Sequence, residues 1–246
     1  MMKKIIVLMA LLCALVVSAS AENWSETNVQ YLYGNDFDQL AGGETVPNGK
    51  METITIEHAG GWDYGKNFFF MDLTSADFGS GKEYLVYAEW APKISLSQVG
   101  ESELSWGIIK DVFIAGEINQ GDDFRAVNLG LALALEIPTF TFFDANLFTR
   151  KDNYNDRTMQ LTLAWKSKFR LFSAPLVFEG FFDYYGTDFG TEVVTQPRLL
   201  LEGTAFSDKL KNLQVGTELY YYRSSAAAWR GSINEAVPQI MIKWIW

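Results

Sequence analysis

A regular alternation of apolar and polar side chains, carried through unusually long stretches, constrains the fold of this chain more than any other feature. In the last stretch Ile240, Ile242 and Trp244 alternate with Met241 and Lys243. Successive side chains of a strand point to opposite faces of a sheet, so this stretch has one apolar face and one more polar face. Twelve strand-like stretches recur, at about residues 24–34, 50–60, 66–75, 82–94, 109–119, 124–136, 139–151, 156–168, 175–187, 191–204, 211–224 and 233–246.

The lengths of these stretches favour a membrane wall. Most have ten to fourteen residues, whereas strands of globular proteins usually have about five or six and a tilted strand crosses a bilayer with about nine to eleven. A soluble antiparallel sheet also alternates, but aromatic residues at the strand ends favour the membrane, because such rings settle at its interface with water. They are Trp24, Tyr31, Tyr33, Trp90, Trp165, Tyr184, Tyr221, Trp244 and Trp246. We therefore predict an all-β fold, an antiparallel transmembrane β-barrel of about 12 strands.

The N-terminus has the three parts of a secretory signal peptide. Two lysines precede an apolar run at residues 5–17, and residues 19–21 (Ala-Ser-Ala) fit an A-x-A cleavage site. The apolar run is too short for a helix that crosses about 30 Å of hydrocarbon. We expect residues 1–21 to be a cleaved signal peptide and residues 22–246 to be an outer-membrane β-barrel.

Charge and composition exclude several classes of function. Without Lys3 and Lys4 the formal charge falls from −10 to −12, with 18 basic against 30 acidic residues. A nucleic-acid-binding protein usually has a basic patch, and a chain this acidic is not expected to have one. We therefore expect no nucleic-acid partner. The single cysteine, Cys13, lies in the predicted signal peptide, so no disulfide framework is expected. The sequence contains no glycine motif of the kind that cradles phosphate, and we expect no cofactor.

The strand count sets the expected topology. An even count places both termini on one side, which we expect to be the periplasmic side. Residues 35–49 then form the first external loop. Residues 95–108 should form a short inner turn but are too long for one. They either hold an extra structured segment, or the strand count is wrong by two.

The chain ends as outer-membrane barrels commonly end. Trp246 is aromatic, and Trp244, Ile242 and Ile240 are apolar at alternating positions before it. The barrel assembly machinery reads terminal strands of this kind. We therefore expect this machinery and outer-membrane lipid as partners, a location in the bacterial outer membrane, and a monomer.

Several stretches carry a family resemblance. They are Trp24 to Tyr31 (WSETNVQY), Thr53 to Gly65 (TITIEHAGGWDYG), Phe68 to Asp72 (FFFMD), Glu192 to Pro197 (EVVTQP) and the closing strand. In these stretches, and in the order of elements over most of the mature chain, the sequence resembles the nucleoside-specific channel-forming (Tsx-like) outer-membrane family and a related outer-membrane barrel domain family of unknown function. The resemblance implies a narrow twelve-stranded barrel that conducts nucleosides. Carried over position by position, it implies substrate binding by Glu57, Phe68, Phe70 and Asp72.

The predicted inward face offers two sets of residues to a solute. The aromatic set is Phe68, Phe70, Tyr87, Phe113, Phe142, Phe148, Phe181, Tyr185, Tyr220 and Tyr222. The polar set is Glu57, Asp72, Glu89, Asp111, Glu117, Asp144, Asn146, Arg150, Lys166, Glu179, Asp183, Arg198, Glu202 and Glu218. A nucleoside base can stack on rings, for about 1–3 kcal/mol per base, while its sugar hydroxyls donate to carboxylates. The bore of a twelve-stranded barrel is wider than that of an eight-stranded barrel, which side chains fill, and narrower than that of an open porin. This width suits single small solutes, and we predict diffusion of nucleosides or similar small neutral solutes.

Two other functions fit the same residues. Acids and bases that face each other can simply pair and hold the wall, which would make a structural or adhesive barrel with a closed lumen. The inward phenylalanines can instead form a path for apolar compounds. No enzyme is expected, because hydrolases of the outer membrane need a Ser–His pair and the only histidine, His58, points away from the adjacent Glu57. Acidic loops leave an external calcium site open, but such loops are more often solvated, and we assign no metal ligand.

Overall fold

The computed structural model describes residues 23–225 and 233–246 of the chain. The predicted signal peptide at residues 1–21 lies outside the described residues. The strand segments are β1 (Trp24–Gly34), β2 (Met51–Trp62), β3 (Gly65–Ala76), β4 (Tyr84–Trp90), β5 (Lys93–Ser95), β6 (Ile109–Gln120), β7 (Arg125–Leu135), β8 (Phe140–Asp152), β9 (Thr158–Leu171), β10 (Ala174–Thr187), β11 (Gly190–Thr195), β12 (Arg198–Glu202), β13 (Leu213–Ser224) and β14 (Ile233–Ile245). The short helices are α2 (Leu96–Val99), η1 (Gly203–Ala205) and η2 (Asp208–Leu210).

The strand segments make twelve barrel strands, because two of the strands are each interrupted at a proline. β4 and β5 both pair with β3 and β6, and Ala91 and Pro92 separate them. β11 and β12 both pair with β10 and β13, and Gln196 and Pro197 separate them. Proline has no N–H to donate to the ladder, so each strand breaks there and then resumes.

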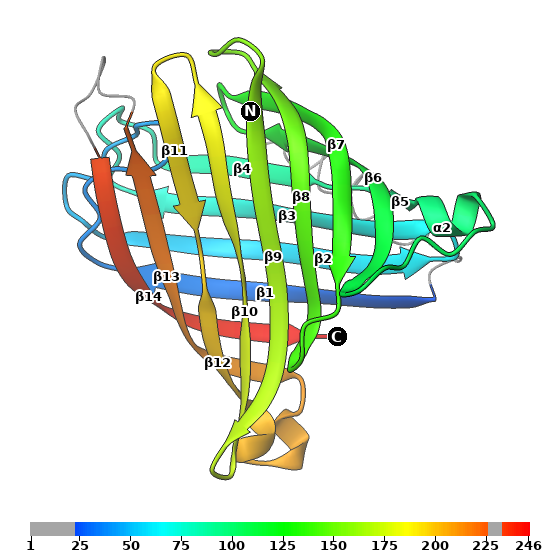
Figure 1. The fold of residues 1–246 in the computed structure, drawn as a ribbon. Helices are drawn as coiled ribbons and strands as arrows, with labels where there is room; N and C mark the ends of the chain where they lie inside the picture. Colours follow the sequence, from blue (N-terminus) through cyan, green and yellow to red (C-terminus); the bar gives the residue numbers. More distant parts are fainter. Residues whose placement is uncertain (1–22, 226–232) are drawn as a thin grey trace, which may run out of the picture.

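The strands close into a ring (Figure 1). Each is antiparallel to its neighbours, and β14 returns to β1, from Asn28 opposite Ile245 to Gly34 opposite Gln239. This closed twelve-stranded antiparallel barrel confirms the predicted fold class. No helix in the described part of the chain is long and apolar enough to cross a membrane.

The two faces of the barrel wall are the reverse of those of a soluble protein. Ile240 and Leu129 on the outside are 59% and 61% exposed, whereas Gln239 and Asn128 on the inside are 3% and 1% exposed. Apolar side chains outside and polar side chains inside are what a barrel surrounded by lipid requires. The predicted alternation and the outer-membrane location are both confirmed.

The end of the barrel that carries Trp24 and Trp246 is called the terminal end. Here the backbone N–H of Trp246 donates to the carbonyl of Thr27 at 3.1 Å, which joins the last residue to the first strand. The long segment 96–108 lies at the same end and begins with α2, capped by the Ser95 hydroxyl. It is therefore an extra structured segment and not a pair of missed strands.

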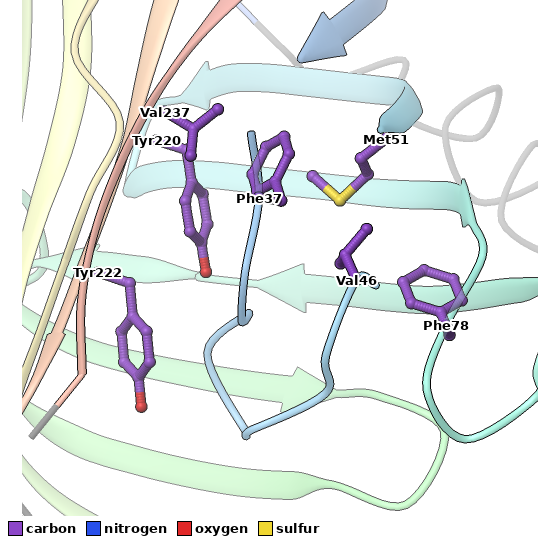
Figure 2. Close-up of a cluster of buried hydrophobic side chains, with 7 residues drawn as sticks. All are labelled: Phe37, Val46, Met51, Phe78, Tyr220, Tyr222 and Val237. Carbon is purple, nitrogen blue, oxygen red and sulfur yellow. The ribbon is translucent and has the colours of Figure 1, made fainter. Parts of the chain in front are cut away.

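At the opposite end, called the loop end, residues 35–50 turn into the mouth of the barrel (Figure 2). This mouth loop buries Phe37 and Val46, which are 1% and 2% exposed. They pack in one cluster with Met51, Phe78, Tyr220, Tyr222 and Val237. The predicted external loop thus lies partly inside the mouth, because Phe37 and Val46 find apolar partners there.

Candidate functional site

Two groups of charged residues lie inside the barrel. The first, called the ion-pair network, consists of Glu26, Glu57, Lys166, Glu179, Arg198, Glu218 and Lys243. The Nε–H of Arg198 donates to Glu218 at 2.6 Å, and the ammonium of Lys243 donates to Glu179 at 2.7 Å. Lys243 is fully buried, so its charge is balanced by carboxylates and not by bulk water.

The ion-pair network crosses the bore. Arg198 on β12 lies 3.2 Å from Glu57 on β2, although these strands are four positions apart in the ring. Lys166 on β9 lies 2.8 Å from Glu26 on β1, five positions away. Contacts between strands so far apart run through the interior and not along the wall. The network therefore ties opposite walls together.

The predicted substrate-binding residues lie together on one inward patch. Phe68, Phe70 and Asp72 alternate along β3, and Glu57 on β2 is directly opposite Phe70. Residues opposite each other in adjacent strands share a face of the sheet. The rings of Phe68 and Phe70 are 6.0 Å apart with planes inclined at 48°. The structure therefore brings these four residues together on the inward face.

The two carboxylates of this patch have different surroundings. Glu57 accepts from Asn28 at 3.0 Å on one oxygen and from Arg198 at 3.2 Å on the other. Asp72 accepts from the Thr55 hydroxyl at 2.5 Å and has no ion pair among the described residues. Glu57 is thus engaged in the ion-pair network, while Asp72 retains more capacity to accept hydrogen bonds from a solute.

Tyr87 lies beside this patch, although it was not among the four predicted binding residues. Its ring lies 5.8 Å from that of Phe70, and it is opposite Asp72 in the pairing of β3 with β4. We call Phe68, Phe70 and Tyr87 the aromatic row. Tyr87 was expected on the inward face, but its place beside Asp72 depends on the register between two strands, which alternation alone does not specify.

A second wall faces the aromatic row. Phe181, Asp183 and Tyr185 alternate along the inward face of β10, which is five positions from β4 in the ring of twelve. Side chains on both walls are half-buried, in contrast to the fully buried interior residues of β1 and β7. Solvent therefore reaches the interior between β3–β4 and β10, which makes this region the candidate solute path.

The second group of charges, called the acidic cluster, consists of Glu89, Glu117 and Asp183. Asn119 donates to Glu89 at 3.0 Å and to Glu117 at 3.1 Å, which links β4 to β6. Gln160 donates to Glu117 at 3.3 Å. The Thr162 hydroxyl donates to Asp183 at 2.5 Å. Amide and hydroxyl groups therefore hold the three carboxylates.

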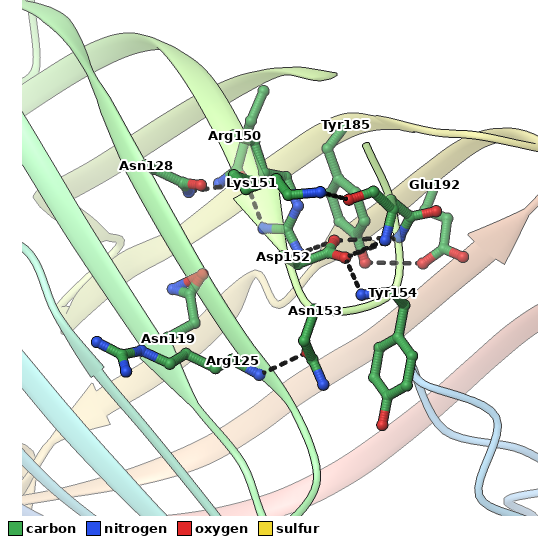
Figure 3. Close-up of polar contacts among 12 residues, drawn as sticks. Asn119, Arg125, Asn128, Arg150, Lys151, Asp152, Asn153, Tyr154, Tyr185 and Glu192 are labelled. Carbon is green, nitrogen blue, oxygen red and sulfur yellow. Dashed lines mark hydrogen bonds and ion pairs between the residues drawn. The ribbon is translucent and has the colours of Figure 1, made fainter. Parts of the chain in front are cut away.

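Arg150 shares the hydrogen-bond partner Gln160 with the acidic cluster, and Figure 3 shows it beside Asp152 and Tyr185. It donates to Asp152 at 3.3 Å and to Gln160 at 2.9 Å. Its guanidinium carbon lies 4.4 Å from the centroid of the Tyr185 ring, a cation–π distance. The Tyr185 hydroxyl in turn donates to Glu192 at 2.8 Å. Arg150 is thus anchored to the wall.

Several buried amide oxygens of the bore have no protein partner within the described residues. They belong to Gln30, Asn128, Asn146, Gln214 and Gln239. A buried amide oxygen is costly to leave without a hydrogen bond. These oxygens can accept hydrogen bonds from water or from a solute inside the barrel.

Residues that could support catalysis or bind a metal are sparse. His58 faces away from Glu57 and lies 2.8 Å from the Thr27 hydroxyl. Across the described ranges no three histidine, cysteine, aspartate or glutamate side chains group closely enough to hold a metal ion. In the loops, Asp122 and Asp123 are near Lys82, at 3.5 and 3.1 Å.

Comparison with known proteins identifies the fold. No family model and no curated protein matches the chain. The KdgM porin aligns with a TM-score of 0.50 and 6% identity, over 89% of this chain and 98% of that one. The KdgM porin in complex with disordered oligogalacturonate aligns with a TM-score of 0.49 and 7% identity, over 88% of this chain and 98% of that one. OpdK from Pseudomonas aeruginosa with vanillate aligns with a TM-score of 0.35 and 9% identity, over 92% of this chain and 100% of that one. At 6% identity the likeness to the KdgM porin shows the fold alone, and that fold is the outer-membrane β-barrel.

Proposed function

We propose that the protein is an outer-membrane channel for the diffusion of small neutral solutes, with nucleosides as the preferred class. The aromatic row beside Asp72 is the observation that carries this proposal. Its neighbouring ring centroids are 5.8–6.0 Å apart on one inward face. The Asp72 carboxylate lies on that face, two residues from Phe70 and opposite Tyr87.

The chemistry of this face suits a nucleoside. A flat base can stack on Phe70 or Tyr87, and stacking on an aromatic side chain contributes about 1–3 kcal/mol. Ribose hydroxyls can donate to Asp72, which already accepts one hydrogen bond from Thr55. The carboxylates of the bore would repel a phosphate group, so nucleosides are favoured over nucleotides.

Two further observations support passage of a solute. The buried amide oxygens without protein partners favour a bore that contains water. The Tsx-like resemblance of the sequence points to the same class of solute. The KdgM barrel carries the name porin, which is in keeping with a channel.

A structural barrel with a closed lumen is the second candidate, and the ion-pair network favours it. Arg198 and Lys166 each reach across the bore to a carboxylate of a distant strand. A channel for apolar compounds, lined by the inward phenylalanines, is the third. The three candidates differ in which solutes pass through the protein.

Swelling of liposomes that contain the refolded protein separates the candidates. Adenosine, arabinose and a short fatty acid are the solutes. We expect adenosine to enter faster than its size alone allows, and Phe70→Ala to remove this advantage while arabinose enters at the same rate or faster. Phe69→Ala is the matched control, because Phe69 is the next residue of β3 and points to the opposite face. Entry of no solute would identify a closed barrel, and preferential entry of the fatty acid would identify an apolar path.

A further inference from the structure

We propose that the acidic cluster of the bore is a binding site for a small organic ammonium ion. Within the described residues Glu89, Glu117 and Asp183 have no lysine, arginine or histidine within ion-pair distance. Four other interior carboxylates do have such partners: Glu57, Glu179 and Glu218 contact Arg198, and Asp144 contacts Lys66 and Lys93. The acidic cluster is thus set apart from the balanced charges of the same barrel.

The nearby cations are engaged elsewhere. Arg150 pairs with Asp152 at 3.3 Å and lies over the Tyr185 ring. Lys66 and Lys93 lie 3.4 and 2.9 Å from Asp144. A charged carboxylate inside a protein is costly unless a cation balances it. No ion pair of the described residues balances Glu89, Glu117 or Asp183, so a cation bound from solution would stabilise the charged forms of these carboxylates.

A buried acceptor beside the acidic cluster independently indicates a ligand with hydrogen-bond donors. Asn128 is 1% exposed, and its amide nitrogen donates to Glu117 at 2.6 Å and to Gln160 at 3.1 Å. The oxygen of the same amide has no partner among the residues described. An acceptor without a donor, next to Glu117, adds to the capacity of this site to accept N–H groups.

The arrangement fits an ammonium ion better than a metal ion. The carboxylates come from β4, β6 and β10, and no described group of three is close enough to hold a metal. An ammonium group has three N–H donors, which can reach carboxylate and amide oxygens in different directions. The aromatic row supplies apolar surface for a short alkyl chain, since Phe70 is directly opposite Glu89. Rings also attract cations directly.

Calorimetry on the refolded protein in a zwitterionic detergent tests this site without requiring conduction. The probe is n-butylammonium chloride, titrated at constant ionic strength against sodium chloride. We expect saturable binding by the wild type and binding at least about tenfold weaker by Glu117→Gln, equivalent to about 1.4 kcal/mol. Glu89→Gln, at a less buried position, should weaken binding in the same direction and provides a second test if Glu117→Gln fails to fold.

The control removes a carboxylate from outside the bore. Glu83→Gln carries the same change on an exposed residue between β3 and β4, and it should bind n-butylammonium like the wild type. Absence of saturable binding by the wild type would overturn the proposal. So would equal binding by all variants, or displacement by sodium at equal concentration. Adenosine entry into liposomes is a separate measurement, so failure of this site and failure of the nucleoside channel are distinguishable.

Discussion

The guanidinium of Arg198 lies 3.2 Å from the carboxylate of Glu57, although their strands are four positions apart in the barrel. The same guanidinium lies 2.6 Å from Glu218. A contact of this kind ties two walls together and also occupies space through which a solute would pass. The stability of the barrel and the width of its bore are therefore linked at Arg198.

We expect Arg198→Gln to widen the path and to destabilise the barrel. Removal of one partner from a buried ion pair costs about 3–5 kcal/mol, because the other charge remains buried. The shorter, neutral side chain also releases the contact with Glu57. Conductance in planar bilayers should rise, and the midpoint of urea unfolding in lipid vesicles should fall.

Arg157→Gln is the control for this prediction, because Arg157 is an exposed arginine in the connection between β8 and β9. It should leave both conductance and unfolding at wild-type values. Unchanged conductance of Arg198→Gln, with folding intact, would mean that solutes do not pass this contact.

The mouth loop should be released by a change at Glu235. One oxygen of this carboxylate accepts from the backbone N–H groups of Asp38 and Gln39, at 3.0 and 2.7 Å. Each hydrogen bond to a charged group contributes about 1.5–3 kcal/mol. In Glu235→Ala, hydrogen exchange at Asp38 and Gln39 should therefore accelerate by about tenfold or more.

Two variants make the mouth-loop prediction specific. Tyr220→Phe removes the hydroxyl that accepts from the Ala41 N–H at 2.8 Å, so it should accelerate exchange at Ala41 more than at Asp38. Glu52→Ala removes an exposed glutamate of β2 and should change neither. Slow exchange at Asp38 and Gln39 in Glu235→Ala would show that the other contacts of the loop hold it without Glu235.

Much of the barrel wall was predictable because alternation is a local signal. Residues 24–34 were predicted as a strand and form β1 with these bounds. The final stretch was predicted with Ile240 and Lys243 on opposite faces, and they are 59% and 0% exposed. The breaks at Pro92 and Pro197 were not predicted, since the stretches around them keep strand-like alternation while only the proline interrupts the ladder.

The contacts inside the barrel were not predictable, because they join residues far apart in sequence. Phe37 packs on Tyr220 with ring centroids 5.6 Å apart, yet nothing local to the mouth loop indicates this partner. Arg198 was predicted to face inward, but alternation does not select Glu57 and Glu218 from the many inward carboxylates. Which carboxylates lie near Arg198 depends on how the barrel closes, and the closure depends on all twelve strands together.

The closing seam leads to a prediction about assembly. Trp246 is 63% exposed, and its backbone N–H donates to Thr27 of β1. A charged side chain at this position replaces an aromatic ring suited to the membrane interface. We expect Trp246→Asp to be exported normally but to give much less heat-modifiable, folded barrel on gels. Trp106→Asp, which changes an exposed tryptophan of the segment between α2 and β6, should assemble like the wild type. Normal assembly of Trp246→Asp would show that the aromatic end is dispensable.

Asp72 allows the sugar contact of the proposed channel to be tested apart from stacking. Its carboxylate accepts from Thr55 at 2.5 Å and is opposite Tyr87 on the inward face. Asp72→Asn keeps the shape of the side chain but replaces one acceptor oxygen with an N–H donor. Ribose hydroxyls then lose an acceptor, while the aromatic row that would stack the base is unchanged. Entry of adenosine into liposomes should therefore slow more than entry of adenine, with arabinose as the size control. Equal slowing of adenosine and adenine would mean that Asp72 shapes the wall and does not contact the sugar.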